Sequence, residues 1–383
     1  MTVGIMFSRI KDFFYRHRRK FVATGVVIGG SVFLLKWLQY KLRELQERQA
    51  REIHEKLKRM QHYECTDRTC NQTIQGLIPA LSENILKRLD TNVILTKLRS
   101  NPPNKLELWE ELRSVAFTRL VTIVYAASML AVTLRVQINI LGGYLYQTMA
   151  DDGKSEEPDR HSISLQVQTA YLSLIQHFMS NGIVRLIDVV SKNVNIVMQR
   201  YSLKQQLTLA DTETLLWSIE MTLNNENGNP VSSIASYTLP DPPAAVGDDS
   251  VFNRLFMETL DVLESVESTE VCLSNVSIGF AKVMDNIAEY YMGSNGVNKN
   301  TKSDLNVECI TNINGIKISL AKLIPIVNGL TKKTLSEVEG TMNNAMMPLV
   351  TEEADFMSSM VVHFLQSEKL RTLGANVYET FCH

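Results

Sequence analysis

The stretch LVTIVYAASMLAVTL, residues 120–134, decides between two ways of folding this chain. It carries no charged residue and lies between Arg119 and Arg135. As an α-helix it would rise about 22 Å, which is short of the roughly 30 Å hydrocarbon core of a membrane. It also lacks the combination of a basic flank with a belt of interfacial aromatic residues that is typical of a membrane span. We therefore predict a buried central helix, with a second membrane span as the alternative.

Helical periodicity extends from residue 71 to the end of the chain. Between Leu172 and Val194, for example, apolar residues recur at steps of three and four, which places them on one helical face. The pattern predicts long helices over residues 104–141, 163–200, 202–223, 251–291 and 316–381, separated by polar segments at 151–161, 224–249 and 293–304. Strand-like alternation is not evident. The predicted fold class is all-α, a single large bundle of long helices.

The composition is that of a protein with a sizeable core and no nucleic-acid partner. Of 383 residues, 45% are hydrophobic and 21% are charged, and the net charge is −2. The five cysteines form an odd, scattered set, which does not indicate a disulfide framework. We predict that the bulk of the chain lies in a reducing, cytosolic environment.

A second apolar stretch, FVATGVVIGGSVFLLKWL, lies near the N-terminus at residues 21–38. It is free of charge from Phe21 to Leu35 and would rise about 27 Å as a helix. A cleaved signal peptide is the alternative, but no small-residue cleavage site follows. We predict a transmembrane anchor that contacts membrane lipid. The remaining predicted parts are a basic targeting tail (1–20), a polar helical stalk (39–62) and a helical body (63–383).

No arrangement of residues in the sequence is typical of an enzyme. The segment DDGKS (151–155) ends like a phosphate-binding loop, but Thr148 stands where the first glycine belongs. Cys65, Cys70 and two nearby histidines match no standard zinc spacing. The other histidines show no pattern of an activated nucleophile. We predict a protein that is not an enzyme and binds neither a cofactor nor a metal.

Two adjacent glycines, Gly142 and Gly143, follow the apolar run. Glycine permits a positive φ or a close approach of two helices. We predict that these glycines end the most apolar helix, and that Gly143 lies beside a buried segment.

The segment NPPNKLELWEELR, residues 101–113, places Trp109 in a charged turn. Two prolines end the preceding element, and Asn104 and Glu107 have the spacing of a capping box. Trp109 shares a helical face with Lys105. Two interpretations are open: Trp109 belongs to the protein's own core, or it forms the floor of a groove that binds a partner's amphipathic helix.

Seven segments of the chain resemble the peroxin-3 family. They are RTCN (68–71), NKLELWEEL (104–112), FTR (117–119), LRVQINILGGYLY (134–146), YLSLIQH (171–177), AKLIPIVNG (321–329) and ANVYETF (375–381). They occur in the family's order across nearly the whole chain. Residues 224–249 and 293–316 match poorly.

The resemblance implies an integral, single-pass peroxisomal membrane protein whose N-terminal anchor carries a cytosolic helical body. In that family the body docks the N-terminal amphipathic helix of peroxin-19, the soluble import receptor for peroxisomal membrane proteins. The positive-inside rule would instead keep the basic tail in the cytosol. We follow the resemblance, because a body with free cysteines suits the cytosol. A structural tether between the organelle and cytosolic partners is the alternative function.

The resemblance also assigns the docking residues. The family's docking tryptophan matches Trp109, and its neighbouring contact residues match Leu98, Pro102, Lys105, Leu106, Leu112, Leu145 and Lys322. Arg99 stands where the family has a lysine and keeps the charge. Leu95 stands where a relative has a threonine, which makes the expected groove slightly more apolar.

Overall fold

The computed structural model describes residues 3–151, 163–225, 229–241, 250–293, 315–331 and 356–382. The side chains of residues 3–34, 150, 151, 250 and 293 are outside this description. The chain divides into two compact units, Met1–His62 and Tyr63–His383. We call the second unit the body.

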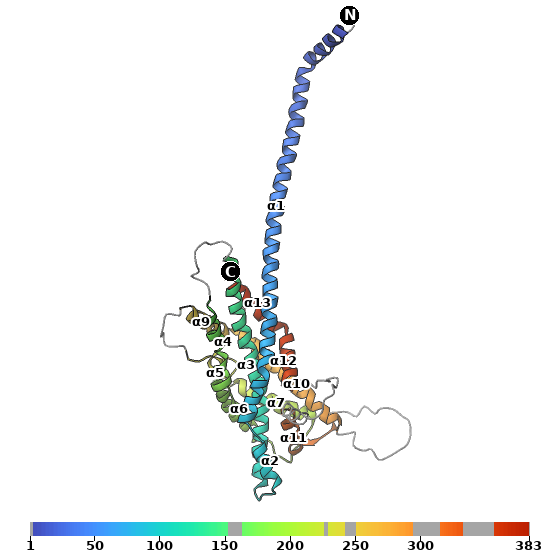
Figure 1. Cartoon of the computed structure of the whole chain (residues 1–383). Helices are drawn as coiled ribbons and strands as arrows, with labels where there is room; N and C mark the ends of the chain where they lie inside the picture. The colour runs from blue at the N-terminus through green and yellow to red at the C-terminus, as the bar shows by residue number, and fades with distance from the viewer. Residues whose placement is uncertain are drawn as a thin grey trace, which may run out of the picture. The chain divides into compact units, whose positions relative to one another are not determined.

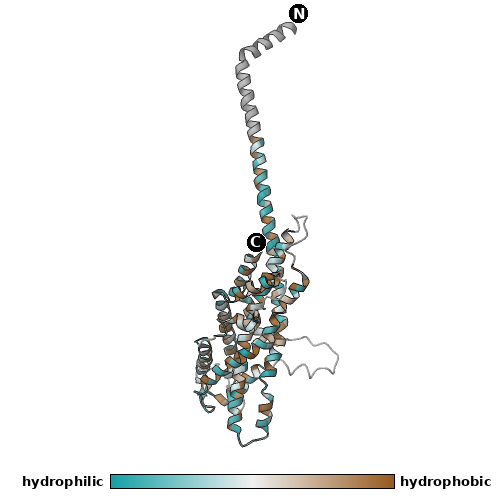
Figure 2. Ribbon diagram, turned by 90° about the vertical axis from the view of Figure 1, so that its left-hand side faces the viewer, coloured by the Kyte–Doolittle hydropathy of each residue, from teal (hydrophilic) through white to brown (hydrophobic). Residues whose placement is uncertain are grey.

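Helix α1 (Val3–Arg88) begins in the first unit and extends into the second. In the first unit most of its described side chains are exposed, including Leu42, Leu45 and Ile53, and this stretch is mainly hydrophilic in Figure 2. Glu44 accepts hydrogen bonds from Lys41 at 2.9 Å and from Arg48 at 2.7 Å. The predicted tail and most of the predicted anchor have side chains outside the described residues, so the tail, anchor and stalk stay predictions.

The described part of the body is built almost entirely of helices, which confirms the all-α fold class (Figure 1). After α1 come α2 (Asn92–Arg99), α3 (Lys105–Asp151), α4 (Leu165–Leu172), α5 (Ile175–His177), the π-helical turn η1 (Phe178–Gly182), α6 (Ile183–Met198), α7 (Leu209–Asn225), α8 (Ile234–Thr238), α9 (Ser250–Leu263), α10 (Val266–Gly293), α11 (Leu320–Leu330), α12 (Phe356–Gln366) and α13 (Glu368–Phe381). Two short antiparallel strands, β1 (Gln206–Leu207) and β2 (Ile318–Ser319), pair Gln206 with Ser319.

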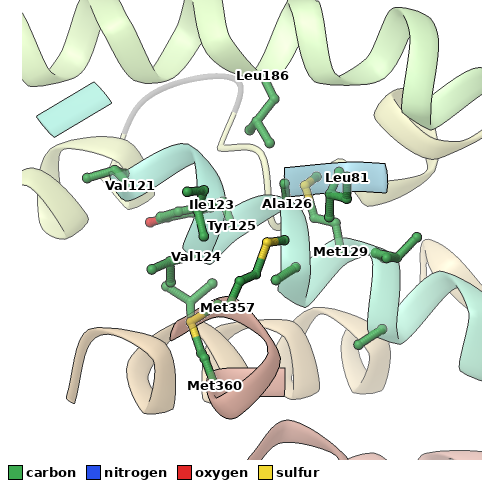
Figure 3. Close-up of a cluster of buried hydrophobic side chains, with 14 of the residues drawn as sticks. Leu81, Val121, Ile123, Val124, Tyr125, Ala126, Met129, Leu186, Met357 and Met360 are labelled. Atoms are coloured by element: carbon green, nitrogen blue, oxygen red, sulfur yellow. The ribbon is translucent and has the colours of Figure 1, made fainter. Parts of the chain in front are cut away.

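Helix α3 is the central element of the body. It is long and apolar enough to cross a membrane, but 94% of its most apolar window is buried within the protein. It packs against α6, α10, α11, α12 and α13, among others. Figure 3 shows Val124 of α3 facing Met357 and Met360 of α12, with Leu81 of α1 and Leu186 of α6 on other sides. The predicted buried central helix at residues 120–134 is confirmed.

Several predicted helix boundaries are wrong. The predicted helix 202–223 begins only at Leu209, because residues 206–207 pair with residues 318–319 as a strand. The predicted helix 163–200 is interrupted after Leu172 and contains the π-helical turn η1. The predicted polar connection 224–249 includes the short helix α8, whose Ile234 and Tyr237 are buried. Most of the connections 151–161 and 293–304 lies outside the described residues.

Helix α3 also buries charge. Arg135 is fully buried and forms an ion pair with Asp67 of α1, whose side chain is 22% exposed. Its guanidinium donates a second hydrogen bond, at 2.7 Å, to the side-chain oxygen of Asn71. On α13, a Cβ added at Gly374 would lie 2.6 Å from Cδ of Arg135, so the two helices meet at this side chain. A single buried arginine therefore organises the packing of three helices.

Candidate functional site

The chain makes a sharp corner between α2 and α3, which we call the α2–α3 corner (residues 92–109). The backbone N–H groups of Ser100 and Asn101 donate to the carbonyls of Lys97 and Leu98 at 3.2 and 3.3 Å, closing the end of α2. Asn101 has a φ of 59°, a left-handed conformation that asparagine tolerates better than most residues. Helix α3 begins directly after Asn104, as a helix cap at that position predicts.

The predicted pairing of Asn104 with Glu107 is present in altered form. The side-chain amide of Asn104 donates to Oε2 of Glu107 at 3.4 Å, so the two side chains bond to each other. The next backbone bond runs from the N–H of Leu108 to the carbonyl of Asn104. The first turn of α3 is therefore fixed by its own residues.

Trp109 is half-buried and packs against the hydrophobic core. On the inner face of the same turns, Leu108 is 6% exposed and Leu112 is 1% exposed. Leu112 is therefore buried in the core of this structure, and its assignment to the docking site stays a prediction. Neither simple interpretation of Trp109 holds alone, because one part of its side chain packs on the core while another part is accessible.

The other predicted contacts on this stretch form a mixed surface around Trp109. Leu95, Leu98 and Pro102 are half-buried, whereas Arg99, Lys105 and Leu106 are exposed. Leu106 is 65% exposed, which is unusual for a leucine on the first turn of a buried helix. The sequence analysis missed Val93 of α2, which is 57% exposed. Helical spacing alone did not single it out, because α2 has apolar residues on more than one side.

A fully buried arginine holds the α2–α3 corner to the body. Arg119 of α3 donates to the backbone and side-chain oxygens of Asn328 at 2.9 and 2.5 Å, and Thr91 donates to the same side-chain oxygen at 2.9 Å. Burial lowers the pKa of Arg119 to about 10, so the guanidinium stays charged at neutral pH. Asn328 belongs to α11, which also carries the exposed Lys322. The Arg119 network therefore ties α11 to the start of α2.

The comparisons with known proteins bear on the whole chain. A family model described as Peroxin-3 matches residues 12–104 and 100–380. The chain belongs to the peroxin-3 family. The two matched ranges meet within the α2–α3 corner, so all of this corner lies inside the peroxin-3 match.

Relatives of this peroxin-3 chain occur in animals and plants. Peroxisomal biogenesis factor 3 of Mus musculus is 34% identical over 396 residues, with 98% of each chain covered. The protein of the same name in Homo sapiens is 34% identical over 399 residues with the same coverage. Peroxisome biogenesis protein 3-2 of Arabidopsis thaliana is 26% identical over 288 residues, which cover 68% of this chain and 78% of its own length. The protein is thus a peroxisome biogenesis factor.

One residue that the resemblance to peroxin-3 assigned to the docking site lies elsewhere. Leu145 is half-buried near the other end of α3. Because α3 is one continuous helix, Leu145 and Trp109 are separated by about 54 Å along its axis. The structure therefore does not bring Leu145 to the α2–α3 corner.

The glycine pair of this peroxin-3 chain also differs from expectation. Gly142 and Gly143 do not end the helix, which continues to Asp151. They allow close packing instead. A Cβ added at Gly142 would lie 2.6 Å from Cγ2 of Thr66, and one at Gly143 would lie 2.8 Å from the carbonyl carbon of Phe381.

The cysteine thiols of Cys70 and Cys272 are buried in the peroxin-3 fold. Burial raises the pKa of the Cys70 thiol to about 11 and that of Cys272 to about 12, so both are protonated at neutral pH. Within the described ranges, no three His, Cys, Asp or Glu side chains are grouped to hold a metal ion.

Proposed function

We propose that this protein is a peroxisomal membrane receptor that docks peroxin-19 at the α2–α3 corner, and so supports the insertion of peroxisomal membrane proteins. The observation that carries the proposal is the half-buried Trp109, held on the core beside the exposed Leu106. A hot-spot side chain is typically an aromatic residue that is supported from below and surrounded by accessible contacts.

The surface around Trp109 suits an amphipathic helix. Leu95, Leu98 and Pro102 offer half-buried apolar contacts for its leucines. Helix α2 contains Lys97 and Arg99 and no acidic residue. Together with Lys105 and Lys322, these basic residues favour a partner helix with carboxylates along its edges. Such rim charges act mainly on the association rate and on its salt dependence.

Replacing Trp109 with alanine tests the docking site. We expect the affinity for an N-terminal peroxin-19 peptide, measured by calorimetric titration, to fall about 30- to 1,000-fold, because truncating a central tryptophan usually costs about 2–4 kcal/mol of binding free energy. The thermal melt of the same variant should change little. Lys105→Glu should weaken binding less, and mainly at low salt.

The matched control is Trp217→Ala, which removes an exposed tryptophan of α7. This variant should bind the peroxin-19 peptide normally. An unchanged affinity of the Trp109→Ala protein would refute the docking assignment. A loss of about 3–5 kcal/mol of fold stability, without a specific loss of binding, would show that Trp109 acts only as a core residue.

The proposal places the protein in the peroxisomal membrane with the body in the cytosol, anchored through residues 21–38. Deleting residues 1–40 should then leave a soluble, folded, helical protein, because α3 buries its apolar surface within the body. The measurement is alkaline extraction of membranes, with circular dichroism of the released protein. A truncated chain that stays in the membrane pellet would contradict the single-anchor topology.

A further inference from the structure

Helices α7 and α10 form the walls of a groove of about 540 Å³. The two helices pack against each other in the body, and Figure 1 shows them as neighbours. Their lining residues run from Glu213 to Glu220 on α7 and from Ser277 to Asp285 on α10. These stretches rise about 10 and 12 Å, so the groove has room for roughly two turns of a helix.

The floor of the groove is apolar and part of one wall is an exposed aromatic ring. Leu216 and Phe280 are buried at the bottom, and Met284 is half-buried beside them. Trp217 is 57% exposed, and Met221 lies one turn further along α7 with 37% exposed. A tryptophan exposed to this extent adds little to the stability of the body. Its exposure next to a groove is typical of an interaction surface.

The rim of the groove is acidic. Glu213 and Asp285 are exposed on opposite walls, and Glu220 of α7 is half-buried. Among the described residues, none of these three carboxylates forms an ion pair with a basic side chain. Helix α7 has three acidic and no basic residues, and α10 has four acidic residues and a single lysine, Lys282. The negative charge of this surface therefore favours a partner with basic side chains.

Glu220 has unused capacity to accept hydrogen bonds. Its contact with Ser277 is long, at 3.4 Å between Oγ and Oε1. Burial raises the pKa of Glu220, while the hydrogen bond from Ser277 lowers it. A guanidinium or ammonium group placed in the groove would stabilise this carboxylate in its charged form.

We propose that the groove between α7 and α10 binds a basic amphipathic helix of a protein partner. Leucine-like side chains of that helix would cover Leu216, Phe280 and Met284. Its arginine or lysine side chains would meet Glu213, Glu220 and Asp285, and one of them would lie over the ring of Trp217. The groove shares no lining residue with the α2–α3 corner, so this partner is recognised independently of peroxin-19.

The test uses the full chain in lipid nanodiscs and a fluorescent synthetic peptide as the probe. The peptide is an 18-residue amphipathic helix with leucines on one face and arginines beside them, and the matched peptide has glutamate in place of arginine. Fluorescence anisotropy gives the affinities. We expect the arginine peptide to bind, more weakly at high salt, and the glutamate peptide not to bind.

Two variants locate the binding. Trp217→Ala removes the exposed ring, and Ala281→Arg places bulk and a positive charge at an exposed position of the groove wall. Each should weaken binding of the arginine peptide about 30-fold or more, without changing the thermal melt. Glu270→Gln is the matched control: it removes an exposed carboxylate of α10 about 22 Å from Asp285, and should leave binding intact. Trp109→Ala should also bind the peptide normally.

Three results would overturn the proposal. They are equal binding of both peptides, binding that neither groove variant weakens, and light scattering in which Ala281→Arg abolishes a dimer of the chain. The last result would assign the groove to a second copy of this protein. Loss of peroxin-19 binding in Trp109→Ala is a separate readout, so failure of one proposal does not conceal the other.

Discussion

Gly143→Glu is expected to unfold the body, with a loss of more than about 4 kcal/mol in the free energy of unfolding. Gly143 is buried on α3 against the last residues of α13. An added Cβ would lie 2.8 Å from the carbonyl carbon of Phe381 and 2.9 Å from its Cβ. Backbone atoms cannot move aside as a flexible side chain can, and the substitution also brings a charge into a buried contact.

Alanine substitutions provide the matched comparison for this prediction. Gly76 lies in α1 with no atom within 4 Å of an added Cβ. Gly76→Ala should stabilise the protein by up to about 1 kcal/mol, because alanine favours a helix over glycine. Gly143→Ala should have the opposite sign. Denaturant unfolding followed by circular dichroism measures both, and an unchanged transition for Gly143→Glu would show that the contact with Phe381 relaxes easily.

Asp67→Ala should have the second large effect, a loss of about 3–5 kcal/mol in stability. The substitution removes the carboxylate that pairs with Arg135, whose side chain is 0% exposed. Asn71 would remain as a hydrogen-bond acceptor, but it carries no charge. The guanidinium would then be buried without a counter-charge, which costs more than the pair itself contributes.

A double variant separates the cost of burying Arg135 without a counter-charge from the stability that its pair with Asp67 contributes. Asp67→Leu combined with Arg135→Met removes both charges, and should recover a large part of the stability lost in Asp67→Ala. The control on the same helix is the surface pair of Glu83 and Lys87, 2.6 Å apart and more than half exposed. Glu83→Ala should cost less than about 1 kcal/mol. Equal losses for Asp67→Ala and Glu83→Ala in chemical unfolding would contradict the role assigned to Arg135.

The sequence predicted the central helix because its signal is local. The apolar run between Arg119 and Arg135 was too short for a span and too apolar for a surface, and α3 is buried as that pattern requires. The glycine pair was wrongly predicted to end the helix, since glycine is compatible with both a helix end and a close contact. The neighbours that decide the matter, Thr66 and Phe381, are distant in sequence.

The candidate site could be predicted only in part, because sequence patterns indicate local structure and not contacts between residues distant in sequence. The corner that carries Trp109 and Lys105 is continuous in sequence, and its prolines and capping residues mark it. The resemblance assigned Leu112 to the docking residues, whereas in the structure Leu112 is 1% exposed on the core side of α3. The bond of Arg119 to Asn328 spans 209 residues, which no local periodicity can indicate.

The two buried arginines of α3 have a consequence for the newly made chain. They are the only charged residues between Arg113 and Asp151. Without them, a charge-free run of more than thirty residues would emerge from the ribosome, long enough to be taken as a span by the machinery of the endoplasmic reticulum. Each arginine near the centre of an inserted helix costs about 2.5–3.5 kcal/mol on the insertion scale. The two side chains that organise the packing of the folded body therefore also disfavour insertion of the unfolded chain into a membrane.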